Sequence, residues 1–173
     1  MSRDNPTLGE KISWRIEAIG YDLVVLLLRA LPVDWASAFG GWLFRTIGPL
    51  TPVNRTASDN MRLAFPKLSE REAFRRGGVR KPGRLLNAQW DNVGRTFAEF
   101  PLMDRIRPGT GRVEVINGER LAAIRDRGEP VVFVSGHFAN WEVMPATIVE
   151  SGVNCLMTYR AMNNPLIDKR VKD

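Results

Sequence analysis

The strongest constraint on the fold is an alternation of patterns that begins at residue 112. Short apolar runs at 112–118 (RVEVING), 130–136 (PVVFVSG) and 154–160 (NCLMTYR) have the length and composition of strands. Helix-like stretches follow each run, at 119–128, 140–152 and 164–173. This order predicts an α/β fold with a β-α-β-α-β unit, in which helices cover a parallel sheet. Three strands make a small sheet, so we expect a larger fold that is cut short at the C-terminus.

The preceding residues, 1–111, carry helical patterns instead. Helices are expected at 12–31, 33–50, 54–65 and 85–100, and the third ends before Pro66 because the residue before a proline disfavours helix. Ser69 and Glu72 fit a capping box that would begin another helix. The sequence therefore predicts a helical region at 1–111 and an incomplete α/β core at 112–173.

Residues 75–84 (RRGGVRKPGR) contain five basic residues and no acidic one. Their glycines and their proline argue against a continuous helix. One interpretation is a solvated basic loop, and the other is a docking patch for phosphates or for an acidic carrier protein. The residues alone leave both interpretations open.

The helix expected at 12–31 combines a broad apolar face with a narrow charged one. Arg15, Asp22 and Arg29 recur every seven residues and so share one stripe of the helix. Each charge at the centre of a membrane span would cost about 2.5 to 3.5 kcal/mol. The helix therefore either packs on the core or associates with a membrane, and three tryptophans within the first 42 residues favour the membrane. Whether it would span the membrane or lie on it stays open.

The charge balance narrows the class of partners. Lysine and arginine outnumber aspartate and glutamate by 25 to 19, a net charge of +6. This surplus favours nucleic acid, anionic lipid, a phosphorylated substrate or an acidic carrier protein. The single cysteine, Cys155, permits no disulfide within the chain and fits a reducing compartment. With only one histidine as well, a dedicated His/Cys metal site is not expected.

That one histidine, His137, follows the expected strand 130–136 directly. Functional groups of parallel α/β sheets gather at the carboxyl ends of strands. Glu142 follows five residues later, in the first turn of the next expected helix, for which Asn140 is a candidate N-cap. A carboxylate that is hydrogen-bonded to one nitrogen of the imidazole leaves the other nitrogen free to accept the proton of a substrate hydroxyl. The alternative is an ordinary structural histidine.

Four blocks of sequence carry a family resemblance: NMRLAFPKLSERE at 60–72, WDNVGRTFAEFP at 90–101, SGHFANWE at 135–142 and YRAMNNPLID at 159–168. In this order they resemble the bacterial lipid A biosynthesis (lauroyl/myristoyl) acyltransferases of the glycerolipid acyltransferase superfamily. That superfamily shares the pattern His-x4-Asp/Glu, which His137 and Glu142 match. The similarity extends over nearly the whole chain.

The resemblance implies an acyltransferase with His137 as general base and Glu142 as its orienting partner. It also implies substrate-binding roles for Gly136, Asn140, Arg160 and Asn164. The donor would be a fatty acyl thioester on acyl carrier protein, and the acceptor a hydroxyl of a phosphorylated glucosamine lipid. No metal or redox cofactor would be required. The enzyme would act at the cytoplasmic face of the inner membrane.

Family members that this chain resembles are substantially longer. We therefore expect the 173-residue chain to be a fragment or a shortened product with little acyltransferase activity of its own.

Two other functions compete with acyl transfer. A membrane-peripheral module that binds anionic lipid without catalysis would use the helix at 12–31 and the basic loop, but it has no need of His137 and Glu142 together. A nucleic-acid-binding protein is suggested by net charge alone. The basic residues are scattered and no recognition motif with interleaved aromatic residues occurs, so we expect no nucleic-acid partner.

Overall fold

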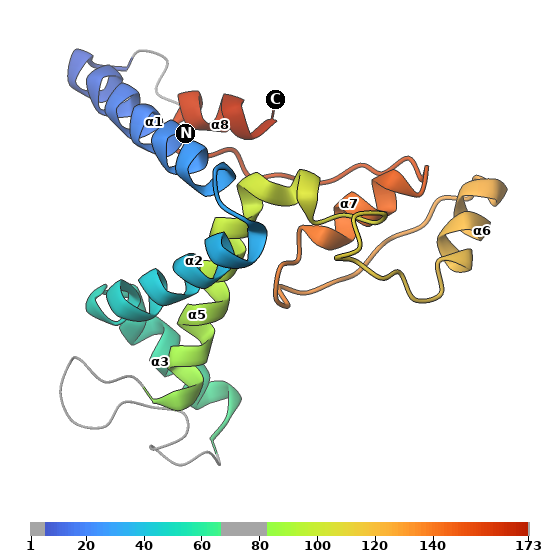
Figure 1. Ribbon diagram of the computed structural model, residues 1–173, viewed down its shortest axis with the longest axis horizontal. Helices are drawn as coiled ribbons and strands as arrows, with labels where there is room; N and C mark the ends of the chain where they lie inside the picture. The colour runs from blue at the N-terminus through green and yellow to red at the C-terminus, as the bar shows by residue number, and fades with distance from the viewer. Residues whose placement is uncertain (1–5, 67–82, 173) are drawn as a thin grey trace. The chain divides into compact units, whose positions relative to one another are not determined.

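The computed structural model describes residues 6–66 and 83–172, and their regular elements are all helices (Figure 1). In chain order they are α1 (Leu8–Arg29), α2 (Val33–Ile47), η1 (Gly48–Leu50), α3 (Val53–Ala64), α5 (Arg84–Glu99), η2 (Phe100–Arg105), α6 (Glu119–Arg127), α7 (Val143–Glu150) and α8 (Pro165–Lys172). These helices belong to two compact units. One contains α1 and the chain from Cys155 through α8, and the other is Leu31–Asn154. The predicted boundary after residue 111 stays a prediction.

The helices expected within the described residues are confirmed, and local signals explain where they begin and end. Thr7 and Glu10 form a capping box at the start of α1, in which each side chain accepts a hydrogen bond from the other residue's backbone N–H. Gly128 ends α6 in the left-handed conformation, with φ of 65°, which glycine adopts without a steric penalty. The capping box expected at Ser69 and nearly all of the basic segment 75–84 lie outside the described residues.

The prediction of a parallel sheet was wrong. None of the segments expected as strands forms one in the described residues, and the only bridge there is an isolated pairing of Pro108 with Val113. Segments 130–136 and 154–160 run without ladder partners among the described residues, and most of their apolar side chains face solvent. Val132 and Val134 are 88% and 89% exposed, and Leu156 is 96% exposed. An apolar run specifies an extended segment, but a strand also needs backbone hydrogen bonds to a neighbour, and these segments lack them.

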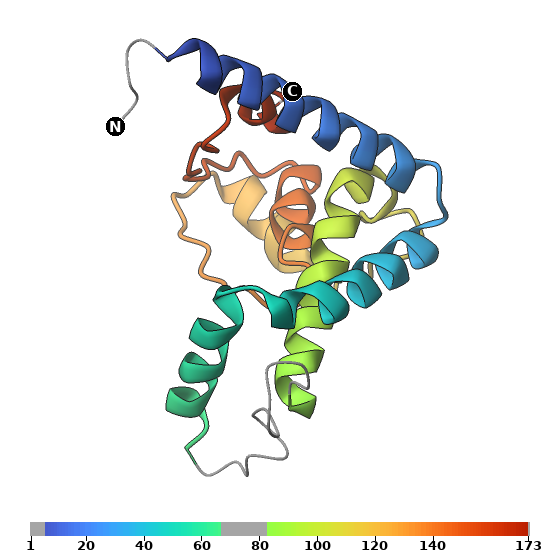
Figure 2. The same ribbon diagram turned by 90° about the vertical axis from the view of Figure 1, so that its left-hand side faces the viewer.

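In the first unit, α8 packs along one face of α1 (Figures 1 and 2). Arg170 of α8 donates two hydrogen bonds to Asp22 of α1, at 2.6 and 2.8 Å. Asp22 belongs to the charged stripe predicted from the sequence. A second stripe of α1 remains exposed and is aliphatic, with members spaced three and four residues apart and therefore on one side of the helix. We call this the aliphatic stripe: Leu8, Ile12, Ile16, Ile19, Leu23, Leu26 and Leu27.

In the second unit, α2 crosses α5 in close contact (Figure 2). Glycines make the approach possible, because a Cβ on Gly40 or Gly94 would collide with the backbone of the other residue. Near the N-terminal end of α5, Leu86 packs with Met61 of α3 in a small apolar cluster. Trp90 of α5 donates from its indole nitrogen to the Asn54 side chain at 2.8 Å. α5 is thus the central helix of this unit.

Among the described residues, no helix combines the length and the apolar character that a membrane crossing needs.

Candidate functional site

The predicted catalytic residues lie in a short loop, residues 135–142, between an extended segment and α7. The Phe138 N–H donates to the Gly136 carbonyl at 2.9 Å, which bends the chain tightly around His137. Ala139 has φ of 46°, a left-handed conformation that is uncommon for a residue with a side chain. The loop is therefore sharply curved, and His137 lies at its bend.

His137 is exposed, and its ring packs against Trp141. Its ring meets the Trp141 ring edge-on, with centroids 4.6 Å apart and planes inclined by 65°. Glu142 is half-buried and is the residue that immediately precedes α7. Within the described part of the chain, no hydrogen bond or ion pair joins the His137 imidazole to the Glu142 carboxylate. The loop brings the two residues into one turn without joining their side chains.

Asn140 fixes the start of α7, although it is not the cap itself. The helix begins after Glu142, two residues later than the predicted N-cap. The Asn140 Oδ1 accepts the Glu142 N–H at 3.3 Å, a local turn that leads into the helix. Its Nδ2 donates to Glu99 at 2.9 Å and lies 3.7 Å from the Met103 sulfur. Both ends of this amide are therefore occupied by protein.

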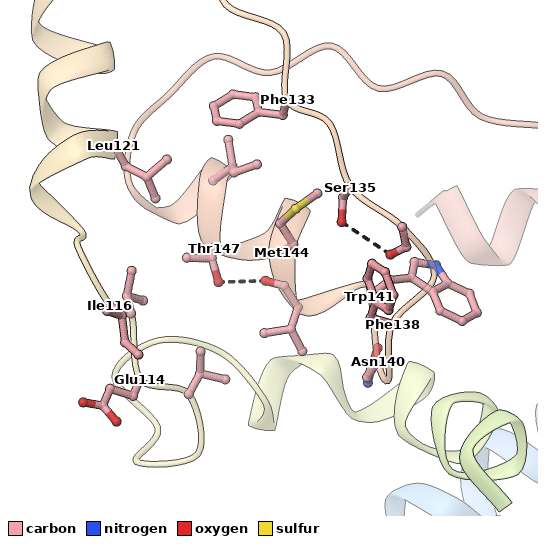
Figure 3. Close-up of a pocket in the computed structure, with 15 residues that line it drawn as sticks. Glu114, Ile116, Leu121, Phe133, Ser135, Phe138, Asn140, Trp141, Met144 and Thr147 are labelled. Carbon is pink, nitrogen blue, oxygen red and sulfur yellow. Dashed lines mark hydrogen bonds between the residues drawn. The ribbon is translucent and has the colours of Figure 1, made fainter. Parts of the chain in front are cut away.

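An apolar pocket of about 420 Å³ lies beside the loop (Figure 3). Leu121 and Ile116 approach it from one side and Met144 of α7 from the other (Figure 3). Its apolar lining consists of Val113, Val115, Ile116, Leu121, Phe133, Phe138, Trp141, Val143, Met144 and Ile148. His137 does not line the pocket, but Gly136 and Phe138 on either side of it do, as does its ring partner Trp141.

The remaining predicted site residues belong to the first unit. Asn164 is buried and caps α8, because its Oδ1 accepts the N–H groups of Leu166 and Ile167 at 2.9 and 3.3 Å. Its Nδ2 donates to the Trp14 carbonyl and to Glu17, both at 2.9 Å. The structure therefore gives this amide a structural role, and its substrate-binding role stays a prediction.

Arg160 is exposed and has no hydrogen bond or ion pair to the described residues. Its guanidinium is available to an anion, and its predicted role also stays a prediction.

Among residues 6–66 and 83–172, no three histidine, cysteine, aspartate or glutamate side chains cluster closely enough to hold a metal ion.

Comparison with known families decides the identity of the chain. The family model described as bacterial lipid A biosynthesis acyltransferase matches residues 12–173. The chain belongs to this family. Comparison with curated proteins and with solved structures found no match. Membership indicates an acyltransferase of lipid A biosynthesis, with an acyl donor and a lipid acceptor as its substrates.

Sequence reasoning missed the residues that attach this acyltransferase's histidine loop to the rest of its unit. Thr96 and Glu99 of α5 both bond to the loop. They are three residues apart, so a helix places them on one face. That shared face was visible in the sequence, but the loop that it contacts was not.

Proposed function

We propose that this acyltransferase moves a fatty acyl group from an acyl carrier protein thioester to a hydroxyl of a lipid A precursor. His137 acts as the general base and Glu142 orients it. The observation that carries the proposal is the position of His137. The chain's one imidazole is flanked by pocket-lining residues and packs on Trp141, which lines the same apolar pocket. A base beside an apolar pocket suits a reaction between a fatty acyl group and a hydroxyl.

The chemistry requires one proton acceptor and a leaving thiol. The neutral imidazole takes the acceptor's hydroxyl proton as the oxygen attacks the thioester carbonyl. Collapse of the tetrahedral intermediate forms the ester and expels the carrier's thiolate, which takes the proton back from the imidazolium. Glu142 would accept a hydrogen bond from the second ring nitrogen and so fix the tautomer. This bond forms in the substrate complex, since catalytic hydrogen bonds commonly tighten only there.

We assign the pocket to the donor's acyl chain. Its lining is mainly aliphatic and aromatic, and each methylene that it removes from water contributes about 0.8 kcal/mol. Phe138 and Trp141 line the pocket beside His137. A chain seated there would hold its thioester end near the imidazole.

We further propose that the enzyme works on the cytoplasmic face of the inner membrane. The aliphatic stripe of α1 would lie among the acyl chains of the lipid surface. The net charge of +6 favours both anionic headgroups and an acidic carrier protein.

Acyl transfer from labelled acyl carrier protein to a phosphorylated glucosamine disaccharide lipid tests the proposal. The assay uses enzyme in excess over donor so that slow transfer is seen. We expect His137→Ala to lower the rate by about 10²- to 10⁴-fold, the usual contribution of a general base. Glu142→Gln lowers it less, because the imidazole remains.

Glu150→Gln is the matched control. This exposed residue ends α7, pairs with Arg107 at 3.2 Å and undergoes the same change of charge as Glu142→Gln. It should leave the rate unchanged. Undiminished transfer by His137→Ala would sink the proposal, and vesicle binding without any transfer would support a lipid-binding module instead.

A further inference from the structure

We propose that Thr96 and Glu99, near the C-terminal end of α5, are positioning residues for the loop that carries His137. Neither contacts the imidazole. They act through Ala139 and Asn140, the two residues in the middle of the His137–Glu142 turn. Their effect on catalysis rests on the function proposed above, whereas their effect on the loop can be measured independently of it.

The Thr96 contact holds the strained residue of the loop. Thr96 is buried, and its hydroxyl lies 3.1 Å from the Ala139 carbonyl and 3.1 Å from the carbonyl of Asn92 in its own helix. Ala139 has φ of 46°, a conformation that costs free energy for any residue other than glycine. Such a conformation persists only where surrounding contacts enforce it, and the Thr96 hydroxyl supplies one such contact.

The Glu99 contact fixes the other half of the turn. One carboxylate oxygen accepts from the Ser37 hydroxyl of α2 at 2.6 Å, and the other accepts from Asn140 at 2.9 Å. Since Asn140 Oδ1 already accepts the Glu142 N–H, its amide group has only one orientation that satisfies both bonds. A continuous series of hydrogen bonds thus runs from Ser37 through Glu99 and Asn140 to Glu142.

The polarity of this series provides a stringent test. In Glu99→Gln, one oxygen remains to accept in place of two. While it accepts from Ser37, an amide nitrogen faces the Asn140 Nδ2 and two donors meet; turned the other way, the side chain no longer accepts from Ser37. In Asn140→Asp, two carboxylates meet. In the double variant Glu99→Gln/Asn140→Asp, the new amide donates to the new carboxylate, and the bonds to Ser37 and to the Glu142 N–H are retained. The two exchanges together leave the net charge of the protein unchanged.

The imidazole signals in the proton NMR spectrum report on the loop, because His137 is the chain's only histidine. The spectrum is taken above the pH range in which imidazoles ordinarily titrate. The Trp141 ring, 4.6 Å away and inclined, displaces these signals from the positions of an unstructured histidine. We expect each single variant to move them toward the unstructured positions and the double variant to restore them.

Glu150→Gln, which removes the same charge from the same unit without touching the loop, should leave the signals in place. Unchanged signals in both single variants, or no restoration in the double variant, would overturn the proposal. A single variant that fails to fold is recognised by the loss of dispersed signals throughout its spectrum. The pair Thr96→Val and Thr96→Ser then decides, because only serine retains the hydroxyl that reaches Ala139.

The transfer assay separates this proposal from the function on which it rests. Each single variant should lower the rate at saturating donor by about 10- to 100-fold, the scale of a misplaced catalytic group, with half-saturating donor concentration unchanged. The double variant should recover the rate. If the double variant restores the imidazole signals but no form of the protein transfers the acyl group, the proposed function alone is contradicted. If the single variants displace the signals and still transfer at the unchanged rate, the positioning role alone is contradicted.

Discussion

Asp168 shows how much one carboxylate organises in the first unit. It accepts hydrogen bonds from the Lys172 ammonium at 2.7 Å, from the Met162 N–H at 2.7 Å and from the Tyr159 hydroxyl at 2.9 Å. These donors, the Lys172 ammonium first among them, lower the pKa of Asp168 from 3.8 to about 2. The hydrogen bond that the Tyr159 phenol donates to the Asp168 carboxylate raises the pKa of Tyr159.

These shifts predict how the α8 region responds to acid. The pKa of Asp168 is lower in the folded state than the ordinary value of 3.8. Its contacts therefore stabilise the fold fully above pH 4 and are lost as the pH falls toward 2. We expect the Met162 amide to exchange faster with solvent across that range, as measured by hydrogen exchange.

Asp168→Asn should abolish that acid response and lower the pKa of Tyr159, which an ultraviolet titration of the two tyrosines would detect. Asp126→Asn changes an exposed carboxylate paired with Arg125 and should alter neither measurement. An acid response that persists in Asp168→Asn would contradict the assignment.

At the scale of single residues, the sequence points to candidates for the chemistry but not to the residues that hold their loop. His137 is a candidate because it is the chain's one imidazole and Glu142 follows it at the spacing of the family resemblance, and its catalytic role stays a prediction. Thr96 and Glu99 were missed because their loop partners are 43 and 41 residues away in the sequence. A hydrogen bond across that separation depends on tertiary structure, which no local pattern specifies.

At the scale of elements, the contact between α2 and α5 depends on the absence of two side chains. Gly94→Ala would place a Cβ against the Gly40 backbone, which cannot rotate away as a side chain can. Overpacking costs about 1–3 kcal/mol, and alanine offsets it by about 1 kcal/mol through helix propensity. We expect a net loss of about 2 kcal/mol in the free energy of unfolding, measured with urea, since a backbone collision falls at the upper end of that cost.

The matched control is Gly20→Ala in α1. A Cβ at Gly20 meets nothing within 4 Å, so the change should stabilise α1 slightly through helix propensity alone. Equal effects at the two glycines would show that propensity, rather than close packing, decides at Gly94.

The helices were predictable and the sheet was not, for one physical reason. A helix satisfies its hydrogen bonds within the segment, so periodicity, caps and prolines specify it locally, as at Thr7 and Gly128. The runs at 130–136 and 154–160 have strand composition, yet they remain unpaired in the structure. Strand composition describes a preference, whereas a sheet requires neighbours that composition does not supply.

At the scale of the whole molecule, net positive charge and the aliphatic stripe predict binding to anionic phospholipid vesicles. Leu23→Glu places a charge on the stripe and should weaken binding at least about tenfold, because burying a leucine contributes about 1.5–3 kcal/mol. Vesicle co-sedimentation measures the change. Salt should weaken the electrostatic part of binding for every form, through screening of the net charge of +6.

Val24→Glu is the control for that experiment. Val24 is the next residue in the chain, it is 54% exposed against 55% for Leu23, and it lies off the stripe. The same charge there should weaken binding much less. Equal losses from the two substitutions would mean that the charge of the protein, and not the stripe, governs binding.

The position of Thr96 and Glu99 on α5 has an evolutionary consequence. Gly94, which sets the distance between α5 and α2, lies only two and five residues before the two residues that hold the histidine loop. A substitution that shifts α5 at the helix contact would therefore also act on the residues that hold the loop. Selection for a stable helix contact and selection for a fixed histidine loop therefore act on the same turn and a half of α5.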